Sequence, residues 1–138
     1  MGERPAIVLV VDDELDILRL VETVLRGAGH VVTSARNADA AIRAVETMAI
    51  KPSLLLTDVV MPGMSGPVLV DQMLAAVPGL GVLFMSGYDE RQVVQRYVVE
   101  KGFALLPKPF TPQSLVAAVH KALETARETV AQAAAEST

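Results

Sequence analysis

The sequence predicts an α/β fold in which helices cover both faces of a doubly wound, five-stranded parallel sheet. Three short segments, 6–11, 53–57 and 81–85, are apolar at nearly every position. Such runs are typical of parallel strands that are buried on both faces. Longer segments with helical periodicity separate these runs. Strands that alternate with helices in this way form parallel sheets joined by right-handed crossovers.

The remaining elements follow from weaker patterns and from helix caps. Ser65 and Thr111 are suited to cap helices, and Pro67 and Pro112 then fall in the first helical turn, where proline is tolerated. We therefore expect strands at 30–35 and 103–106, and helices at 14–26, 39–48, 65–76, 89–100 and from 111 onward. Their periodicity predicts buried stripes made of Leu15, Leu18, Val21 and Leu25 in the first helix, Val68, Leu69, Met73 and Leu74 in the third, and Leu115, Val119 and Leu123 in the fifth.

Composition and length limit what the chain can be. With 138 residues, 51% of them hydrophobic, the chain can form one compact domain. We assign residues 1–128 to that domain and 129–138 to an Ala-rich tail that prolongs the last helix or frays. The net charge of −4 argues against direct nucleic-acid binding, and the lack of cysteine excludes disulfides and thiol catalysis. Without a targeting signal or a membrane-spanning stretch, the chain is expected to be cytoplasmic with no membrane contact.

Polar residues follow the predicted strands at their carboxyl ends, where ligands bind in such sheets. Taken singly, each has an ordinary explanation as a helix cap, a turn residue or a solvated lysine. Taken together, converging carboxylates would repel one another and need a cation, and oxygen ligands suit Mg2+. A lysine and a hydroxyl beside them suit a phosphoryl group. The set comprises Asp12 and Asp13 after the first strand, Asp58 after the third, Ser86 after the fourth and Lys108 after the fifth.

The motifs around these residues resemble those of response regulator receiver domains in two-component signalling. They read VDD at 11–13, TDVVMPGMSG at 57–66, MSGY at 85–88 and KPF at 108–110, in the family's order and approximate spacing. These motifs are most similar to those of receivers in hybrid histidine kinases and of stand-alone single-domain regulators. The resemblance implies a flavodoxin-like (βα)5 fold with strand order 2-1-3-4-5 and a cis peptide between Lys108 and Pro109.

The resemblance also implies a role for each site residue. Asp58 would accept a phosphoryl group from a phosphohistidine of a histidine kinase or a histidine phosphotransfer protein. Ser86 and Lys108 would contact the phosphoryl oxygens. The expected cofactor is Mg2+, held by Asp13, Asp58 and the backbone carbonyl of Val60, with Asp12 acting mostly through a metal-bound water.

Two positions concern how phosphorylation is sensed and preserved. Leu105 stands where many receivers carry an aromatic residue that reports activation, so output is expected to use another rearrangement or the domain only relays phosphate. Tyr88 is expected to shield the acyl phosphate from water. The valines of segment 89–100 either belong to the core or form, with the fifth helix, a contact surface for an unknown downstream protein or a homodimer.

Other functions fit the sequence less well. A phosphohydrolase of the haloacid dehalogenase type needs a second acid two residues after its nucleophile, and Val60 occupies that position. We therefore expect no enzyme beyond a domain that catalyses its own phosphorylation and dephosphorylation. The alternative is a degenerate receiver that binds proteins without being phosphorylated.

Overall fold

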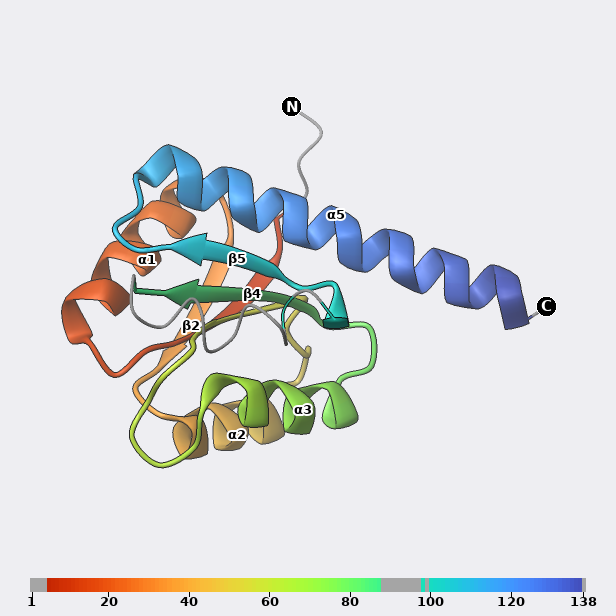
Figure 1. Ribbon diagram of the computed structural model, residues 1–138, viewed down its shortest axis with the longest axis horizontal. Coiled ribbons are helices and arrows are strands. Elements are labelled where there is room, and N and C mark those ends of the chain that lie inside the picture. Colours follow the sequence, from red (N-terminus) through yellow and green to blue (C-terminus); the bar gives the residue numbers. More distant parts are fainter. Residues whose placement is uncertain (1–4, 88–97, 99, 138) are drawn as a thin grey trace.

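The computed structural model describes residues 5–87, 98 and 100–137. Five parallel strands form one sheet in the order β2-β1-β3-β4-β5 (Figure 1), which confirms the predicted fold class and strand order. The strands are β1 (Ile7–Val11), β2 (Val31–Ala35), β3 (Leu54–Asp58), β4 (Gly81–Ser86) and β5 (Ala104–Pro107). The helices are α1 (Leu15–Gly27), α2 (Ala38–Thr47), α3 (Gly66–Ala76) and α5 (Pro112–Ser137).

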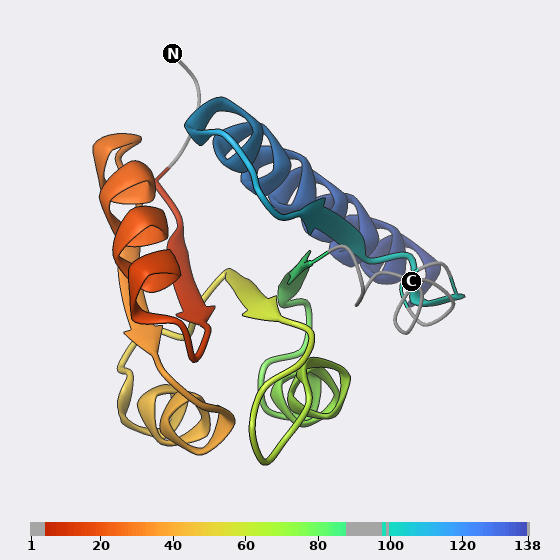
Figure 2. The same ribbon diagram turned by 60° about the vertical axis from the view of Figure 1, so that its left-hand side comes forward.

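The helices cover the sheet from both sides. Figures 1 and 2 show α1 and α5 on one face and α2 and α3 on the other. Alternate residues of each central strand serve the two faces, so Leu55 packs in the core beneath α2 and α3 while Leu56 packs beneath α1 and α5. Every residue of β3 and β4 is buried. The continuous apolar runs of the sequence are explained by these two cores.

The predicted elements agree with the structure to within a few residues, but two buried positions are wrong. Leu15 and Val68 are 39% and 48% exposed. Leu15 is the first residue of α1, and the buried residues of this helix begin one turn later, at Leu18. In α3, Val70 is buried instead of Val68, because this helix is apolar on most sides and its pattern does not fix its rotation. The stripe of the fifth helix, Leu115, Val119 and Leu123, is buried as predicted.

The expected helix at 89–100 and Tyr88 lie mostly outside the described residues. Val98, Glu100 and Lys101 are helical, and Val98 is buried in the core. For this one valine the structure supports core packing.

The predicted tail continues the last helix. α5 runs without a break from Pro112 to Ser137, and its C-terminal end projects beyond the sheet (Figure 1). Thr111 caps its start, because the Thr111 hydroxyl accepts the Ser114 N–H at 3.0 Å. Within the described part of the chain, no helix combines the length and apolar character that crossing a membrane requires.

The N-terminus of α3 lies directly against the end of β3, at Gly66. A Cβ atom on Gly66 would collide with the Asp58 carbonyl oxygen and would lie 3.2 Å from the Phe84 ring. The Gly66 N–H also donates to the Val59 carbonyl at 2.8 Å. Glycine at this position therefore lets α3 start close to the residue that ends β3.

We expect Gly66→Ala to lower the free energy of unfolding by about 1–3 kcal/mol, because the added methyl meets backbone that cannot move aside. Urea denaturation measures the change. Gly27→Ala is the matched control, since a Cβ there meets nothing within 4 Å. Equal stability of the two variants would contradict the close packing at Gly66.

Candidate phosphoacceptor site

Polar side chains from four strands meet at the carboxyl edge of the sheet. The ends of β1, β3, β4 and β5 are nearly level, because neighbouring strands in this part of the sheet end within one residue of each other in the register. At this edge Asp12, Asp58 and Ser86 are all at most 3% exposed. The sequence predicted this convergence, and the residues that form it are Asp12 after β1, Asp58 and Ser86 at the ends of β3 and β4, and Lys108 after β5.

Lys108 connects the carboxylates of this edge. Its Nζ lies 3.1 Å from Asp12 Oδ2, 3.4 Å from Asp58 Oδ1 and 3.5 Å from Glu14 Oε1. Its backbone N–H donates to the Ser86 carbonyl at 2.8 Å, which ties the segment after β5 to the end of β4. The peptide bond between Lys108 and Pro109 is cis, as the resemblance implied. One ammonium faces three carboxylates, so negative charge is in excess.

The carboxylates are held by backbone hydrogen bonds. Asp12 Oδ1 accepts the Glu14 N–H at 2.9 Å, and Asp58 Oδ1 accepts the Val59 N–H at 3.0 Å. Asp12, Glu14 and Asp58 each place one carboxylate oxygen within 4.8 Å of the other two. Such a group of oxygens around excess negative charge could hold a hard divalent cation.

The protonation states follow from burial and from this crowding. Burial raises the pKa of Asp12 above its usual 3.8, although the Glu14 N–H and Lys108 both act to lower it. Burial alone would lower the pKa of Lys108, but the carboxylates of Asp58, Asp12 and Glu14 outweigh burial and raise it above 10.5. The pKa of Asp12 thus rises because the carboxylate is buried, and the pKa of Lys108 rises because several acids share this one lysine. Lys108 is therefore charged at neutral pH. Ionised Asp12, in contrast, destabilises the folded protein because its carboxylate is buried.

In protein without divalent metal, we expect Asp12→Asn to raise the melting temperature at about pH 7 by a few degrees. The amide removes the burial cost of the carboxylate and can still accept the Glu14 N–H. The cost is absent below the unfolded pKa of 3.8 and complete above the raised folded pKa, so the two proteins should converge toward about pH 4. Thermal melts in EDTA across this range measure the effect. A variant less stable than wild type at neutral pH would contradict it.

The same pair of proteins tests cation binding. Mg2+ at 100 times its dissociation constant should stabilise the wild type by about 2.7 kcal/mol. Asp12→Asn should gain far less, because it lacks a ligand. Asp39→Asn, at an exposed acid of α2, is the control and should respond to Mg2+ like the wild type. Equal Mg2+ stabilisation of all three proteins would show that this edge does not bind the ion.

One residue of the acidic group was not singled out from the sequence, and one residue expected as a metal ligand is not among the members of this group. Asp13 is exposed and is not part of the group that Asp12, Glu14 and Asp58 form. Glu14 is the N-cap residue of α1, and its longer side chain reaches back to Lys108. The available signal was the uninterrupted acidic run at 12–14.

The remaining predicted residues lie around this edge or outside the described chain. Val60 is 51% exposed in the loop after β3. Leu105, in β5, is partly buried and packs against the core beneath α2 and α3. Tyr88 falls outside the described residues. The structure therefore gives positions for Val60 and Leu105 but does not test their roles.

Comparison with known proteins identifies the family. Residues 8–120 match the family described as response regulator receiver domain. The DNA-binding transcriptional regulator NtrC of Salmonella typhimurium is 34% identical over 117 residues, which are 85% of this chain and 24% of that protein. The sensor kinase CckA of Brucella abortus is 32% identical over 120 residues, 86% of this chain and 13% of that kinase. The chain thus spans about a quarter or less of these relatives.

Solved structures give the same result. A crystal structure of NtrX from Brucella abortus in complex with ADP has a TM-score of 0.85 at 30% identity, covering 94% of this chain and 30% of that one. A receiver domain protein from Clostridium thermocellum has a TM-score of 0.79 at 26% identity, covering 91% and 98%. The chain belongs to the response regulator receiver domain family, whose members are signalling modules of two-component systems.

Proposed function

We propose that this receiver domain accepts a phosphoryl group on Asp58, with Mg2+ as cofactor, and thereby switches a protein-interaction surface. The donor would be a phosphohistidine of a histidine kinase or of a histidine phosphotransfer protein. The observation that carries the proposal is the position of Asp58. Its carboxylate is buried at a strand end, 3.4 Å from the Lys108 ammonium and beside the Asp12 and Glu14 carboxylates.

The side chains of this edge fit a divalent cation. Asp12 and Asp58 would be ligands, with Asp13 or Glu14 beside them and the Val60 carbonyl as the resemblance implies. Bound Mg2+ would supply positive charge against the carboxylates and the phosphoryl oxygens. The excess of carboxylates over ammonium at Lys108 supports this assignment, because the carboxylates repel one another without a cation.

The chemistry asked of the protein is positioning and charge compensation. A carboxylate oxygen of Asp58 forms a bond to phosphorus while the bond from phosphorus to the donor imidazole nitrogen breaks. That nitrogen keeps the electron pair, and the ring leaves neutral because its other nitrogen carries a proton. Lys108 would then pair with a phosphoryl oxygen. Hydrolysis of the acyl phosphate would release phosphate and restore the Asp58 carboxylate, so the domain would act only on itself.

Ser86 would donate a hydrogen bond to the phosphoryl group. Its hydroxyl is fully buried and has no hydrogen-bond partner among the described residues. A buried hydroxyl without a partner is costly, and a phosphoryl oxygen could accept its proton. β4 ends at Ser86, one residue beyond the register partner of Asp58.

We expect Ser86→Ala to slow phosphorylation by a small donor roughly tenfold, as the loss of one hydrogen bond to a charged group implies. Stability should not fall, since the hydroxyl has no partner within the described structure. Ser86→Thr keeps the hydroxyl and should retain most of the rate. Rates come from intact mass measured over time. If Ser86→Ala and Ser86→Thr react at the same rate, the hydroxyl does not contact the phosphoryl group.

Signalling output would run through protein contacts. NtrC is described as DNA-binding, but the acidic charge of this chain gives no support for direct DNA contact here. We propose that phosphorylation changes how the segment after β4 and helix α5 meet a downstream protein or a second copy of the chain. Added charge at Asp58 would draw Ser86 and Lys108 inward and bias these elements between two arrangements.

The experiment that tests the function is phosphorylation by acetyl phosphate with Mg2+ or with EDTA. We expect one added phosphoryl group that requires Mg2+ and is lost on mild alkaline treatment, as an acyl phosphate is. Peptide mass analysis should place it on Asp58. An adduct on another residue, or no adduct although Mg2+ binds, would contradict the proposal and favour a receiver that binds partners without phosphorylation.

A further inference from the structure

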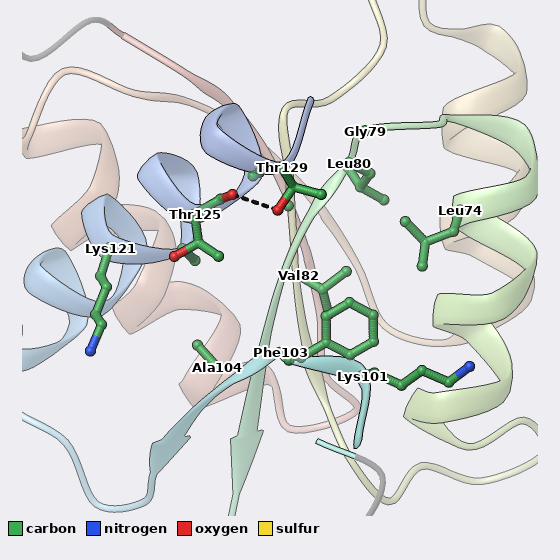
Figure 3. Close-up of a pocket in the computed structure, with 14 residues that line it drawn as sticks. Leu74, Gly79, Leu80, Val82, Lys101, Phe103, Ala104, Lys121, Thr125 and Thr129 are labelled. Atoms are coloured by element: carbon green, nitrogen blue, oxygen red, sulfur yellow. Dashed lines mark hydrogen bonds between the residues drawn. The ribbon is translucent and has the colours of Figure 1, made fainter. Parts of the chain in front are cut away.

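A pocket lies at the opposite end of the sheet from Asp58. This pocket, of about 440 Å³, opens at the amino ends of β4 and β5, between the end of α3 and the middle of α5 (Figure 3). β4 separates it from the carboxyl edge by its own length, about 16 Å at 3.3 Å per residue. The volume falls within the usual range for small-molecule sites. None of the residues placed at the phosphoacceptor edge lines it.

The pocket exists because its walls carry small side chains. Six of the fourteen lining residues are glycine or alanine. A Cβ on Gly81 would lie 3.2 Å from Ala126 Cβ, and one on Gly79 would lie 2.9 Å from a methyl group of Val130. These contacts fix how closely α5 passes the start of β4. Beside this close passage the small residues leave space unfilled.

The lining defines the chemistry of an occupant. Leu80, Val82 and Phe103 provide apolar surface, and Figure 3 shows the Phe103 ring beside Val82. The charged residues among the lining are Lys101 and Lys121, and both are positive. Neither lysine has an ion-pair partner within the described structure. A chain of net charge −4 thus presents a locally cationic, mainly apolar cavity.

We infer that this pocket binds a small amphiphilic anion, with an apolar chain or ring against Leu80, Val82 and Phe103 and an acidic head group at Lys101 or Lys121. Charge complementarity selects the anion, because the described lining offers cations and no carboxylate to oppose them. In Figure 3, Lys121 lies on the α5 side of the pocket and Lys101 near α3. Either ammonium can therefore meet a head group at the rim while the apolar part lies inside.

The test uses decanoate as the probe and backbone amide NMR shifts of the whole chain as the readout. We expect saturable shifts centred on Gly79, Gly81 and Gly102, with no comparable change at Asp58. Decyltrimethylammonium, which has the same chain and the opposite charge, should bind at least fivefold more weakly. Absence of saturable shifts with decanoate, or equal binding of the cation, would overturn the inference.

Two variants separate the head group from the cavity. Lys101→Gln combined with Lys121→Gln should weaken decanoate binding roughly fivefold. Thr125→Phe should abolish it, because Thr125 lines the pocket from an exposed position of α5 where a ring can fill the space without disturbing the core. Arg43→Gln, an exposed cation on α2, is the control and should bind like the wild type. Unchanged binding in Thr125→Phe would place the ligand elsewhere and overturn the inference, whatever the outcome at Asp58.

Discussion

Asp58→Asn should abolish phosphorylation by acetyl phosphate while the protein stays folded. The amide is nearly the same size as the carboxylate, and its oxygen can still accept the Val59 N–H that Asp58 Oδ1 accepts at 3.0 Å. It lacks the nucleophilic oxygen, so no acyl phosphate can form. Intact mass after incubation with donor and Mg2+ measures the adduct, and a thermal melt confirms the fold.

The control for this loss is an acid that the site does not use. Asp39→Asn changes an exposed carboxylate in the first turn of α2 and should accept one phosphoryl group at the wild-type rate. A persistent adduct in Asp58→Asn would show that another residue is the acceptor. A lost adduct in both variants would mean that general charge, and not the strand-end carboxylate, controls the reaction.

Lys108→Gln should slow phosphorylation about a hundredfold, the usual effect of removing one charged group that compensates developing negative charge. Lys108 is the ammonium that Asp12, Asp58 and Glu14 share at 3.1–3.5 Å. Initial rates of adduct formation at saturating Mg2+ provide the measurement. Lys121→Gln, an exposed lysine of α5, should react at the wild-type rate.

A second readout distinguishes this role from simple damage to the site. Removing an ammonium from a group of carboxylates leaves more negative charge for a cation, so Mg2+ should bind Lys108→Gln at least as tightly as wild type. A slow reaction together with intact Mg2+ binding supports a direct contact between Lys108 and the phosphoryl group. A wild-type rate in the variant would contradict that contact, and a joint loss of rate and of Mg2+ binding would indicate a disrupted site.

Much of this arrangement could be predicted because the short apolar runs and the longer segments with helical periodicity both indicate strands that alternate with helices. The apolar runs that contain Leu9, Leu55 and Phe84 had to be strands buried on both faces, and parallel strands bring their carboxyl ends to one edge. That geometry predicts that the polar residues after these strands meet at one edge, and they are Asp12, Asp58, Ser86 and Lys108. The cis peptide at Pro109 followed only from the family resemblance.

The structure differs from the sequence-based prediction where the periodicity of the chain does not fix the direction of a side chain. Val68 and Val70 are both apolar in α3, so only tertiary packing decides that Val70 is buried. Glu14 joined the acidic group because the N-cap position turns its side chain back toward Lys108, which the order of residues does not reveal. The pocket between α3 and α5 depends on how closely α5 approaches Gly79 and Gly81, and no local pattern sets that distance.

The most direct test of the account is a crystal structure of the domain with Mg2+ and beryllofluoride, which mimics a phosphoryl group. The account predicts beryllium bonded to an Asp58 carboxylate oxygen, Mg2+ held by Asp58 and Asp12, and fluorine atoms that accept hydrogen bonds from Lys108 Nζ and Ser86 Oγ. Beryllofluoride bound away from Asp58, or an edge that stays empty at saturating Mg2+ and beryllofluoride, would contradict the claim that this edge is a phosphoacceptor site.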